Sequence, residues 1–152
     1  MNKIFFVSCL LIILTGCVQD SPNIKQIENM QFFIDNKENK GVIEIEPGLQ
    51  YSVLESGDSA GLTPDLNQTI SAHFHGTLTN GEVFWSSLDT EPLEIELSKL
   101  IIGCQKTISL MKEGDKWMVY IDPTMAYGEE GRPGIPSNSI LIFEIELLNI
   151  DT

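Results

Sequence analysis

The sequence predicts an α+β fold in which an antiparallel sheet wraps around one short helix. Short segments with alternating apolar and polar residues recur from residue 48 onward, which is typical of strands. Several are joined by hairpin-type connections, and Asn80-Gly81 is the clearest hairpin signal. Apolar residues recur at helical spacing over residues 101–111, which predicts one short helix in this part of the chain.

The strand pattern is regular enough to place each strand and some of its faces. Trp117, Val119 and Ile121 fall on one side of their strand. Phe84 and Trp85 are adjacent, so alternation predicts that they point to opposite faces, with Trp85 toward water if Phe84 faces the core. The predicted strands are 49–54, 69–79, 82–85, 93–97, 116–121 and 140–150, with a long loop at 122–139.

The predicted helix has one apolar face, and a glycine follows it. Gly114 is expected to end the helix, because glycine readily adopts the left-handed conformation of a helix C-terminus. The residues of the apolar face are Ile101, Cys104, Ile108 and Met111.

The first 16 residues have the organisation of a secretory signal. Lys3 precedes an apolar stretch at 4–14, which is too short to span a membrane as a helix. Leu-Thr-Gly-Cys at 14–17 resembles the lipobox of bacterial lipoproteins, which predicts cleavage before Cys17 and lipidation of that cysteine. The alternative is an ordinary signal peptide followed by a chance cysteine.

Residues 17–47 are expected to form a lipid-anchored tether, and residues 48–152 the folded domain. Apolar residues at helical spacing, Ile27, Met30 and Phe33 or Ile34, allow a short helix in the tether, and a tether with a single helical turn is equally compatible. There is no room for a long dimerisation helix, which favours a monomer.

Charge and cysteine content restrict the possible partners. The formal net charge of −13 makes nucleic acid a poor partner, and the acidic surface is repelled by anionic lipids. Membrane attachment should therefore come from the lipid on Cys17. After cleavage Cys104 is the only other cysteine, so no internal disulfide is expected.

Four segments carry a resemblance to a known family. GLQYSVLESG, NGEVFWSS, EGDKWMVYIDPTMAYGEEGRPGIPSNS and LIFEIELL occur in this order. Together they resemble the FKBP-type peptidyl-prolyl cis–trans isomerases, over residues 48–150. The GLQY start resembles the bacterial surface and periplasmic branch, which includes the macrophage infectivity potentiator type. The resemblance implies a half-open antiparallel sheet wrapped around one short helix, with an apolar pocket between them.

The resemblance also implies an activity, its partners and a location. The substrates would be proline-containing unfolded or refolding polypeptides, and macrolide inhibitors of the family could bind. No metal or cofactor is expected, because a dry apolar cleft that binds the twisted amide better than the planar one lowers the barrier without a nucleophile, metal or cofactor. The location would be the bacterial cell envelope, lipid-anchored and facing the periplasm. Val18 after Cys17 favours the outer membrane under the usual sorting rule.

The family pocket maps onto named positions of this sequence. Tyr127 would donate its hydroxyl to a substrate carbonyl, and the backbone N–H of Ile101 would anchor the peptide. Phe84 and Phe143 would enclose the proline ring. These four residues are the predicted catalytic set, and the predicted substrate-binding set is Phe74, Trp85, Leu93, Leu100, Cys104 and Ile135.

Several positions depart from the family pattern. Trp85 stands where the family usually has Asp, and Phe74 where it usually has Tyr. Cys104 replaces a large residue, often Trp, and Arg132 stands where His is common. Trp85 either overhangs the cleft and refills space lost at Cys104, or it is a surface side chain packed on a neighbouring loop. A catalytically weak chaperone or partner-binding module is therefore the alternative to an active isomerase.

A His-x-His pair flanks Phe74. His73 and His75 could contribute to a metal site, although no third ligand is evident in the sequence. The interpretation we prefer is an exposed polar face, because alternation directs both histidines away from the pocket.

Overall fold

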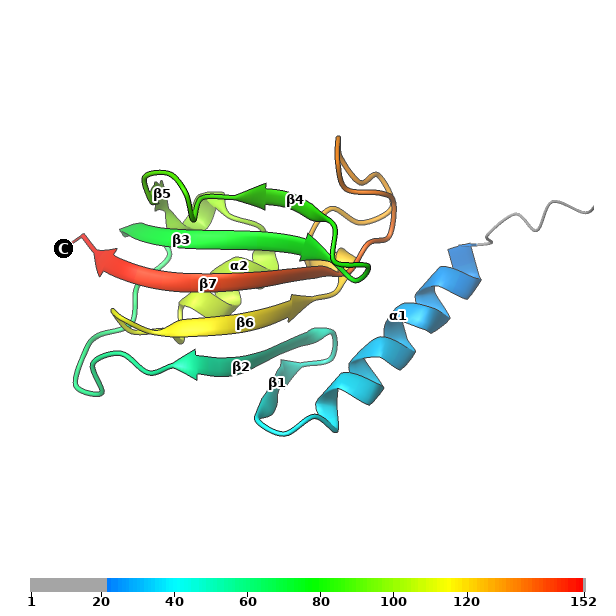
Figure 1. Cartoon of the computed structure of the whole chain (residues 1–152), viewed down its shortest axis with the longest axis horizontal. Helices are drawn as coiled ribbons and strands as arrows, with labels where there is room; N and C mark the ends of the chain where they lie inside the picture. Colours follow the sequence, from blue (N-terminus) through cyan, green and yellow to red (C-terminus); the bar gives the residue numbers. More distant parts are fainter. Residues whose placement is uncertain (1–21, 152) are drawn as a thin grey trace, which may run out of the picture.

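A seven-stranded antiparallel sheet forms the body of the molecule in the computed structural model, which describes residues 22–151. The spatial order is β1-β2-β6-β7-β3-β4, and β5 pairs with β3 (Figure 1). The expected signal peptide and Cys17 lie outside the described residues. The strands are β1 Val42–Glu46, β2 Leu49–Glu55, β3 Thr69–Leu78, β4 Val83–Ser86, β5 Leu93–Glu96, β6 Lys116–Ile121 and β7 Leu141–Ile150.

The predicted α+β class is confirmed, and each predicted strand is observed with its ends within one residue. β1 was not predicted, because its residues follow a polar, irregular stretch. Gly48 has a φ of 83° and makes the tight turn between β1 and β2, and a Cβ there would lie 2.7 Å from Cβ of Asp122. This turn adds an edge strand to the sheet.

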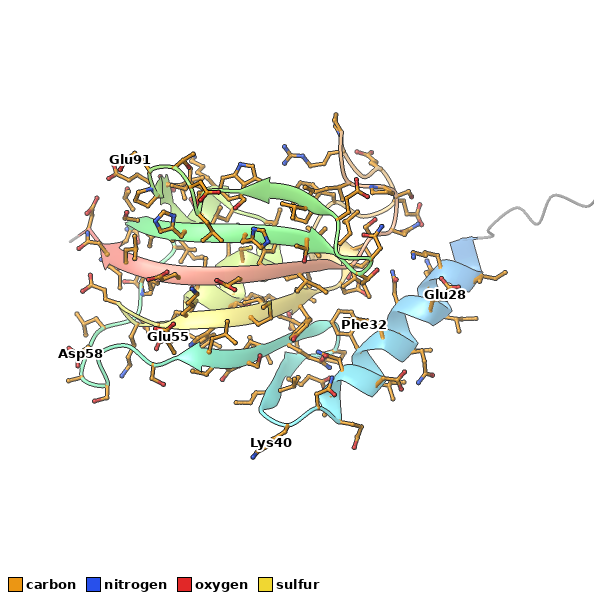
Figure 2. All side chains as sticks on the ribbon, viewed as in Figure 1. Glu28, Phe32, Lys40, Glu55, Asp58 and Glu91 are labelled. Carbon is orange, nitrogen blue, oxygen red and sulfur yellow. The ribbon has the colours of Figure 1, made fainter. Side chains whose placement is uncertain are left out.

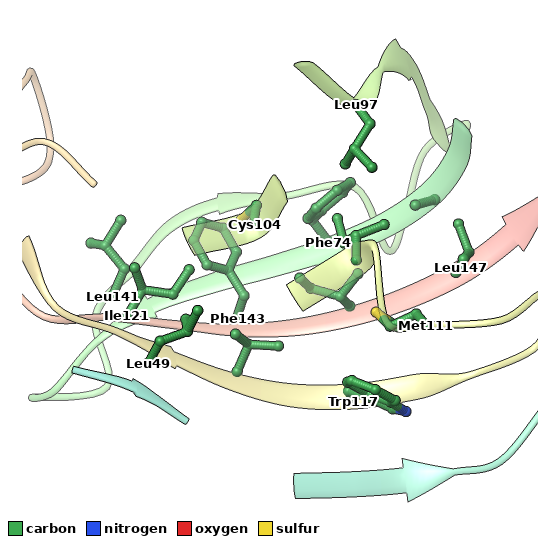
Figure 3. Packing of buried hydrophobic residues seen from close by; sticks show 14 of the residues in the cluster. Leu49, Phe74, Leu97, Cys104, Met111, Trp117, Ile121, Leu141, Phe143 and Leu147 are labelled. Atoms are coloured by element: carbon green, nitrogen blue, oxygen red, sulfur yellow. The ribbon is translucent and has the colours of Figure 1, made fainter. Parts of the chain in front are cut away.

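The core lies between the concave face of the sheet and the helix α2, Ile102–Ile108 (Figure 3). Burial alternates along β3, β6 and β7, so each strand directs every second side chain into the core. Cys104, Ile108 and Met111 are buried, as the predicted helix face requires.

The helix is shorter than predicted, and Gly114 does not end it. α2 stops at Ile108, and Met111 reaches the core from a turn in which its N–H donates to the Ile108 carbonyl at 2.9 Å. Gly114 lies beyond that turn with a φ of 84°, and its N–H donates to Leu147 O of β7 at 2.7 Å. The turn after Ile108 thus supplies Met111, the last residue of the apolar face that periodicity assigned to the helix.

Close packing of α2 on the sheet depends on Gly103. A Cβ at this position would lie 2.4 Å from Cγ2 of Ile121 on β6, closer than two carbon atoms can approach. The glycine lets the helix backbone approach the strand, which fixes where the first turn of α2 lies.

A second helix, α1 Pro22–Lys37, lies beside the edge of the sheet formed by β1 and β2 (Figure 1) and contacts side chains of the outer face there. The sequence left a short helix and a single turn as alternatives, and the structure shows 16 helical residues. Gln50 is fully buried between helix and sheet, where its amide donates to Phe33 O at 2.8 Å and accepts from Asn36 Nδ2 at 2.9 Å. The ring of Phe32 lies 6.2 Å from that of Tyr120 on the same side of the helix (Figure 2).

The other side of α1 is apolar and open to solvent. Its exposed residues are Ile24, Ile27, Met30 and Ile34. Neither helix in the described part of the chain combines the length and apolar character that crossing a membrane requires.

We predict that Gly103→Ala lowers the free energy of unfolding by about 1–3 kcal/mol, the usual cost of overpacking a core. The added methyl group would displace α2 from Ile121, and this outweighs the better helix propensity of alanine. Urea unfolding measures the change. Ile102→Ala, at an exposed position of the same helix, is the control and should stay within about 0.5 kcal/mol. A stability of Gly103→Ala equal to or above that of the parent would contradict this packing argument.

Candidate active site

A cleft of about 530 Å³ opens beside α2 on the concave face of the sheet. Every side chain that the sequence predicted for the pocket lies on its wall. Lys99, Arg132 and Pro133 also line the cleft, and the sequence did not predict a place in the wall for any of them. The full lining is Phe74, Phe84, Trp85, Leu93, Lys99, Leu100, Ile101, Cys104, Tyr127, Arg132, Pro133, Ile135 and Phe143.

Three phenylalanine rings from three strands form an interlocking cluster in the cleft wall. Phe84 of β4 meets Phe143 of β7 edge to face, with ring centroids 5.4 Å apart and planes at 90°. Phe143 also meets Phe74 of β3 in a T-shaped contact at 6.3 Å. Such contacts fix ring orientation more tightly than unspecific apolar packing does. The cluster therefore gives the cleft a rigid apolar surface.

Gly76 of β3 makes the space that the cluster occupies. A Cβ at this position would lie 2.5 Å from Cζ of Phe84 and 2.9 Å from Cε1 of Phe143. Both rings therefore lie over a stretch of bare backbone on a central strand. Sequence reasoning missed this residue, and a glycine in the middle of an otherwise alternating strand was the signal that could have revealed it.

A bulge in β4 explains why Trp85 lies at the cleft instead of pointing away from it. Gly76 pairs with Trp85 and Thr77 pairs with Val83, so β4 carries Phe84 as an extra residue at this point. A bulge breaks the alternation of side chains, and the prediction that Phe84 and Trp85 face opposite sides is wrong for this reason. Trp85 is 41% exposed, and its ring centroid lies 5.8 Å from that of Phe74.

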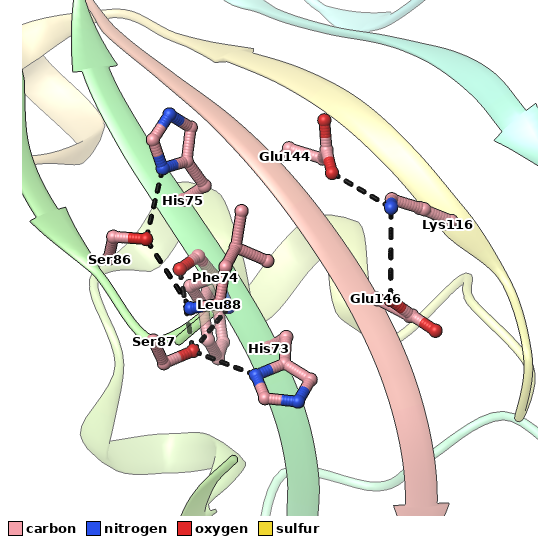
Figure 4. Close-up of polar contacts among 9 residues, drawn as sticks. All are labelled: His73, Phe74, His75, Ser86, Ser87, Leu88, Lys116, Glu144 and Glu146. Atoms are coloured by element: carbon pink, nitrogen blue, oxygen red, sulfur yellow. Dashed lines mark hydrogen bonds and ion pairs between the residues drawn. The ribbon is translucent and has the colours of Figure 1, made fainter. Parts of the chain in front are cut away.

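Serine side chains hold the end of β4 against β3. Ser87 Oγ accepts the Phe74 N–H at 3.0 Å, and the Ser87 N–H donates to Phe74 O at 2.9 Å. On the outer face of the sheet, Nδ1 of His73 lies 3.2 Å from Ser87 Oγ, and Nδ1 of His75 lies 3.0 Å from Ser86 Oγ (Figure 4). The histidines thus brace β4 from the side opposite the cleft.

The outer face of the sheet also carries a group of charges (Figure 4). Lys116 lies 2.9 Å from Glu144 and 3.8 Å from Glu146. The hydrogen bond to Glu144 raises the pKa of Lys116, and the charges of both glutamates act in the same direction. Within residues 22–151, no three His, Cys, Asp or Glu side chains gather closely enough to hold a metal ion.

Tyr127 lies between the short 3-10 helix η2, Pro123–Met125, and a tight turn of the following loop. Nη1 of Arg132 donates to the Tyr127 hydroxyl oxygen at 2.7 Å, and the guanidinium carbon lies 4.9 Å from the ring centroid. Because the oxygen accepts from Arg132, the hydroxyl hydrogen remains free to donate to another group. Tyr127 therefore offers a directed donor at the cleft.

Two backbone features complete the wall. Ile101 is the N-cap of α2, where its carbonyl accepts from Gln105 at 3.0 Å, and the helix does not use its N–H. Arg132 and Ile135 exchange backbone hydrogen bonds of 2.9 and 2.8 Å, and this turn places the buried Ile135 in the cleft wall. The geometry thus combines apolar walls with a small number of donors.

Comparison with known proteins identifies the family. The family model for FKBP-type peptidyl-prolyl cis-trans isomerase matches residues 61–148, more than half of the chain. The protein belongs to this family.

Relatives in the FKBP family come from several bacteria. Peptidyl-prolyl cis-trans isomerase Mip of Coxiella burnetii is 40% identical over 121 residues, which cover 78% of this chain and 52% of the relative. FKBP-type peptidyl-prolyl cis-trans isomerase FkpA of Aeromonas hydrophila is 36% identical over 127 residues, which cover 83% and 47% of the two chains. The chain thus spans about half the length of these curated relatives.

Two solved structures have the same fold. A peptidyl-prolyl cis-trans isomerase from Pseudomonas syringae superposes with a TM-score of 0.80 at 29% identity, covering 88% of this chain and 99% of that one. FkpA from Escherichia coli superposes with a TM-score of 0.77 at 34% identity, covering 84% of this chain and 59% of that one.

Cys104 stands in the wall of this FKBP-type cleft as a small apolar group. Its side chain is buried, and burial raises the pKa of the thiol to about 12, because a thiolate would lose its hydration there. The thiolate is the nucleophilic form, so an elevated pKa makes the thiol unreactive at neutral pH.

We predict that Cys104 resists alkylation by iodoacetamide in the folded protein at pH 8. A thiol with a pKa of about 12 has roughly one part in 10⁴ as thiolate at that pH. Peptide mapping by mass spectrometry separates its modification from that of any other cysteine. The same protein in urea should react within minutes and serves as the control. Fast modification of the folded protein would show that the thiol is accessible.

Proposed function

We propose that this protein is a peptidyl-prolyl cis–trans isomerase that acts on proline-containing unfolded or refolding polypeptides. The observation that carries the proposal is the aromatic cleft, in which the free hydroxyl hydrogen of Tyr127 is the directed donor. Membership of the FKBP family supports it. Phe84, Phe143, Tyr127 and Ile101 are the proposed catalytic residues, and the other predicted pocket residues bind substrate.

The proposed mechanism uses the peptide bond itself. Rotation about an X–Pro bond has a barrier of about 18–20 kcal/mol, because the planar amide loses its resonance. Unaided isomerisation takes about 10–100 s at 25 °C. A cleft that binds the twisted amide more tightly than the planar one lowers this barrier by the difference in binding free energy. Each tenfold acceleration requires about 1.4 kcal/mol of such preference.

Different residues of the cleft contribute to the preferential binding of the twisted amide. Phe84 and Phe143 enclose the proline ring and keep water away from the amide, which favours the less polar twisted state. Tyr127 donates its hydroxyl hydrogen to a substrate carbonyl, and the Ile101 N–H holds the peptide backbone. No atom is transferred, so the cleft needs only shape and fixed donors.

A second candidate function is a binding module that keeps the pocket without efficient catalysis. Trp85 favours it, because an indole stands where the family usually has a carboxylate, and indole is a donor only. The indole side chain also lines the cleft and is 41% exposed.

Prolyl isomerisation of the purified protein, measured with and without a macrolide inhibitor of the family, tests the two functions. Catalysis that the macrolide suppresses supports the isomerase. Macrolide binding without catalysis supports the binding module. Neither catalysis nor binding would overturn both.

We predict that Tyr127→Phe lowers kcat/KM for prolyl isomerisation about two- to tenfold, the value of one net hydrogen bond. The substitution keeps the ring and removes the donor. Tyr120→Phe is the matched control, because the Tyr120 ring packs against Phe32 of α1 and is not part of the cleft wall. Equal losses in the two variants, or none in Tyr127→Phe, would contradict the role of the Tyr127 hydroxyl.

We further propose that lipid on Cys17 anchors the protein in the cell envelope, facing the periplasm and more specifically at the outer membrane. The clients would be exported proteins. The acidic composition supports lipid attachment over electrostatic attachment, since anionic head groups repel this surface.

We predict that Cys17→Ser moves the protein from the membrane fraction to the soluble fraction of cells. The thiol is the proposed attachment point of the lipid, and serine removes it. Cys9→Ser is the matched control, since this residue lies within the proposed signal peptide. Unchanged membrane association of Cys17→Ser would contradict lipidation at this residue.

We also propose a monomer. The exposed apolar side of α1 is the surface that a second copy of the chain would cover in a dimer, so the oligomeric state in solution tests the proposal. Light scattering across a range of concentrations distinguishes the mass of one chain from that of two.

A further inference from the structure

We propose that the cleft selects prolyl substrates in which an acidic residue, Asp or Glu, immediately precedes the proline. The inference rests on the proposed isomerase function and names the substrate class that the same site prefers. It comes from the charges at the cleft, which are opposite to those of the chain as a whole.

The chain as a whole is strongly acidic, with 22 Asp and Glu residues against 9 Lys and Arg residues. Among residues 22–151, no Asp or Glu lines the cleft, whereas Lys99 and Arg132 both do. Positive charge thus gathers at the cleft of a protein whose charge is negative overall. A carboxylate is repelled by most of this surface and attracted to the cleft.

Neither cation at the cleft forms an ion pair with a carboxylate of the described part of the chain. The ion pairs within residues 22–151 use Lys25, Lys37, Lys106 and Lys116. Arg132 donates from Nη1 to the neutral Tyr127 hydroxyl, which occupies one of the five guanidinium N–H donors. Four donors and the full charge of Arg132 remain for a ligand.

The other polar side chains at the cleft are also donors. Trp85 lines the cleft at the position where the family usually has a carboxylate, and its indole can only donate. The Tyr127 hydroxyl hydrogen is free. Hydrogen-bond acceptors on a substrate therefore meet several donors at the cleft. A substrate carboxylate adds charge complementarity to this match.

Contacts to neighbouring residues hold Arg132 in place. The turn that it makes with Ile135 has two backbone hydrogen bonds, and its guanidinium packs against the Tyr127 ring. We place the carbonyl that precedes the proline nitrogen at the Tyr127 hydroxyl, whose oxygen lies 2.7 Å from Arg132 Nη1. The side chain of the residue carrying that carbonyl then lies beside Arg132, which places the selected carboxylate immediately before the proline.

Isomerisation of capped peptides Ala-Xaa-Pro-Phe, with Xaa as Glu, Gln, Leu or Lys, tests the inference. Glu and Gln have nearly the same shape, so the ratio of their kcat/KM values isolates the charge. We expect Glu to exceed Gln about two- to fivefold, the range of an exposed ion pair, and Lys to be the poorest of the four. Raising the ionic strength to about 1 M, where the Debye length is about 3 Å, should bring the Glu to Gln ratio toward one.

Variants assign the effect to the cleft. Lys99→Gln and Arg132→Gln should each reduce the Glu to Gln ratio, and the double variant should abolish the preference. Trp85→Asp should also reduce it, since it places a carboxylate at the cleft. Lys40→Gln is the control for loss of one positive charge, because Lys40 lies in the turn before β1 and points away from the sheet (Figure 2). Its ratio should match that of the parent.

The outcomes separate this inference from the proposed function. Turnover of Leu-Pro and Gln-Pro peptides without preference for Glu would overturn the inference and leave the isomerase intact. Absence of turnover for all peptides would overturn the isomerase, and the charge preference is then decided by titrating the same peptides into the protein and following backbone amide shifts. Equal affinity for the Glu and Gln peptides would overturn the inference in that case as well.

Discussion

The length of α2 relative to the strands that it covers determines the rest of the architecture. Seven helical residues span about 10 Å, whereas the ten residues of β3 or β7 span about 33 Å. One short helix therefore cannot cover the whole concave face of the sheet. The uncovered part is the cleft, and its apolar side chains are those that a longer helix would have buried. Gly103 contributes to this arrangement, because the absence of a side chain lets the helix pack close to β6.

Backbone features shape the cleft as much as side chains do. Gly76 removes one side chain from a central strand, so that two phenylalanine rings can lie there. The extra residue in β4 turns Trp85 toward the cleft. Neither feature adds a reactive group. They fix the position of rings and donors before a ligand arrives, which is what the proposed isomerisation, a rotation without bond cleavage, requires.

Periodicity in the sequence predicted most strands, because one face of each strand is buried and the other is in contact with solvent. It failed where tertiary contacts decide the structure. The bulge at Phe84 depends on the register with β3, and β1 depends on the turn at Gly48. The contact between Arg132 and Tyr127 depends on how the loop folds back, so the sequence showed only an unusual residue there. The pocket residues came from family motifs, since their burial alone resembles that of any core.

The place of β7 in the sheet has a consequence for how the chain acquires its structure. β7 lies between β6 and β3, yet it is synthesised after every other strand of the sheet. Its pairing with β3 joins residues about seventy positions apart, and contacts of such long range form slowly. Until β7 is inserted, β1, β2 and β6 have no hydrogen-bonded connection to β3, β4 and β5. The two halves of the sheet therefore cannot be joined around α2 until the last strand has been synthesised.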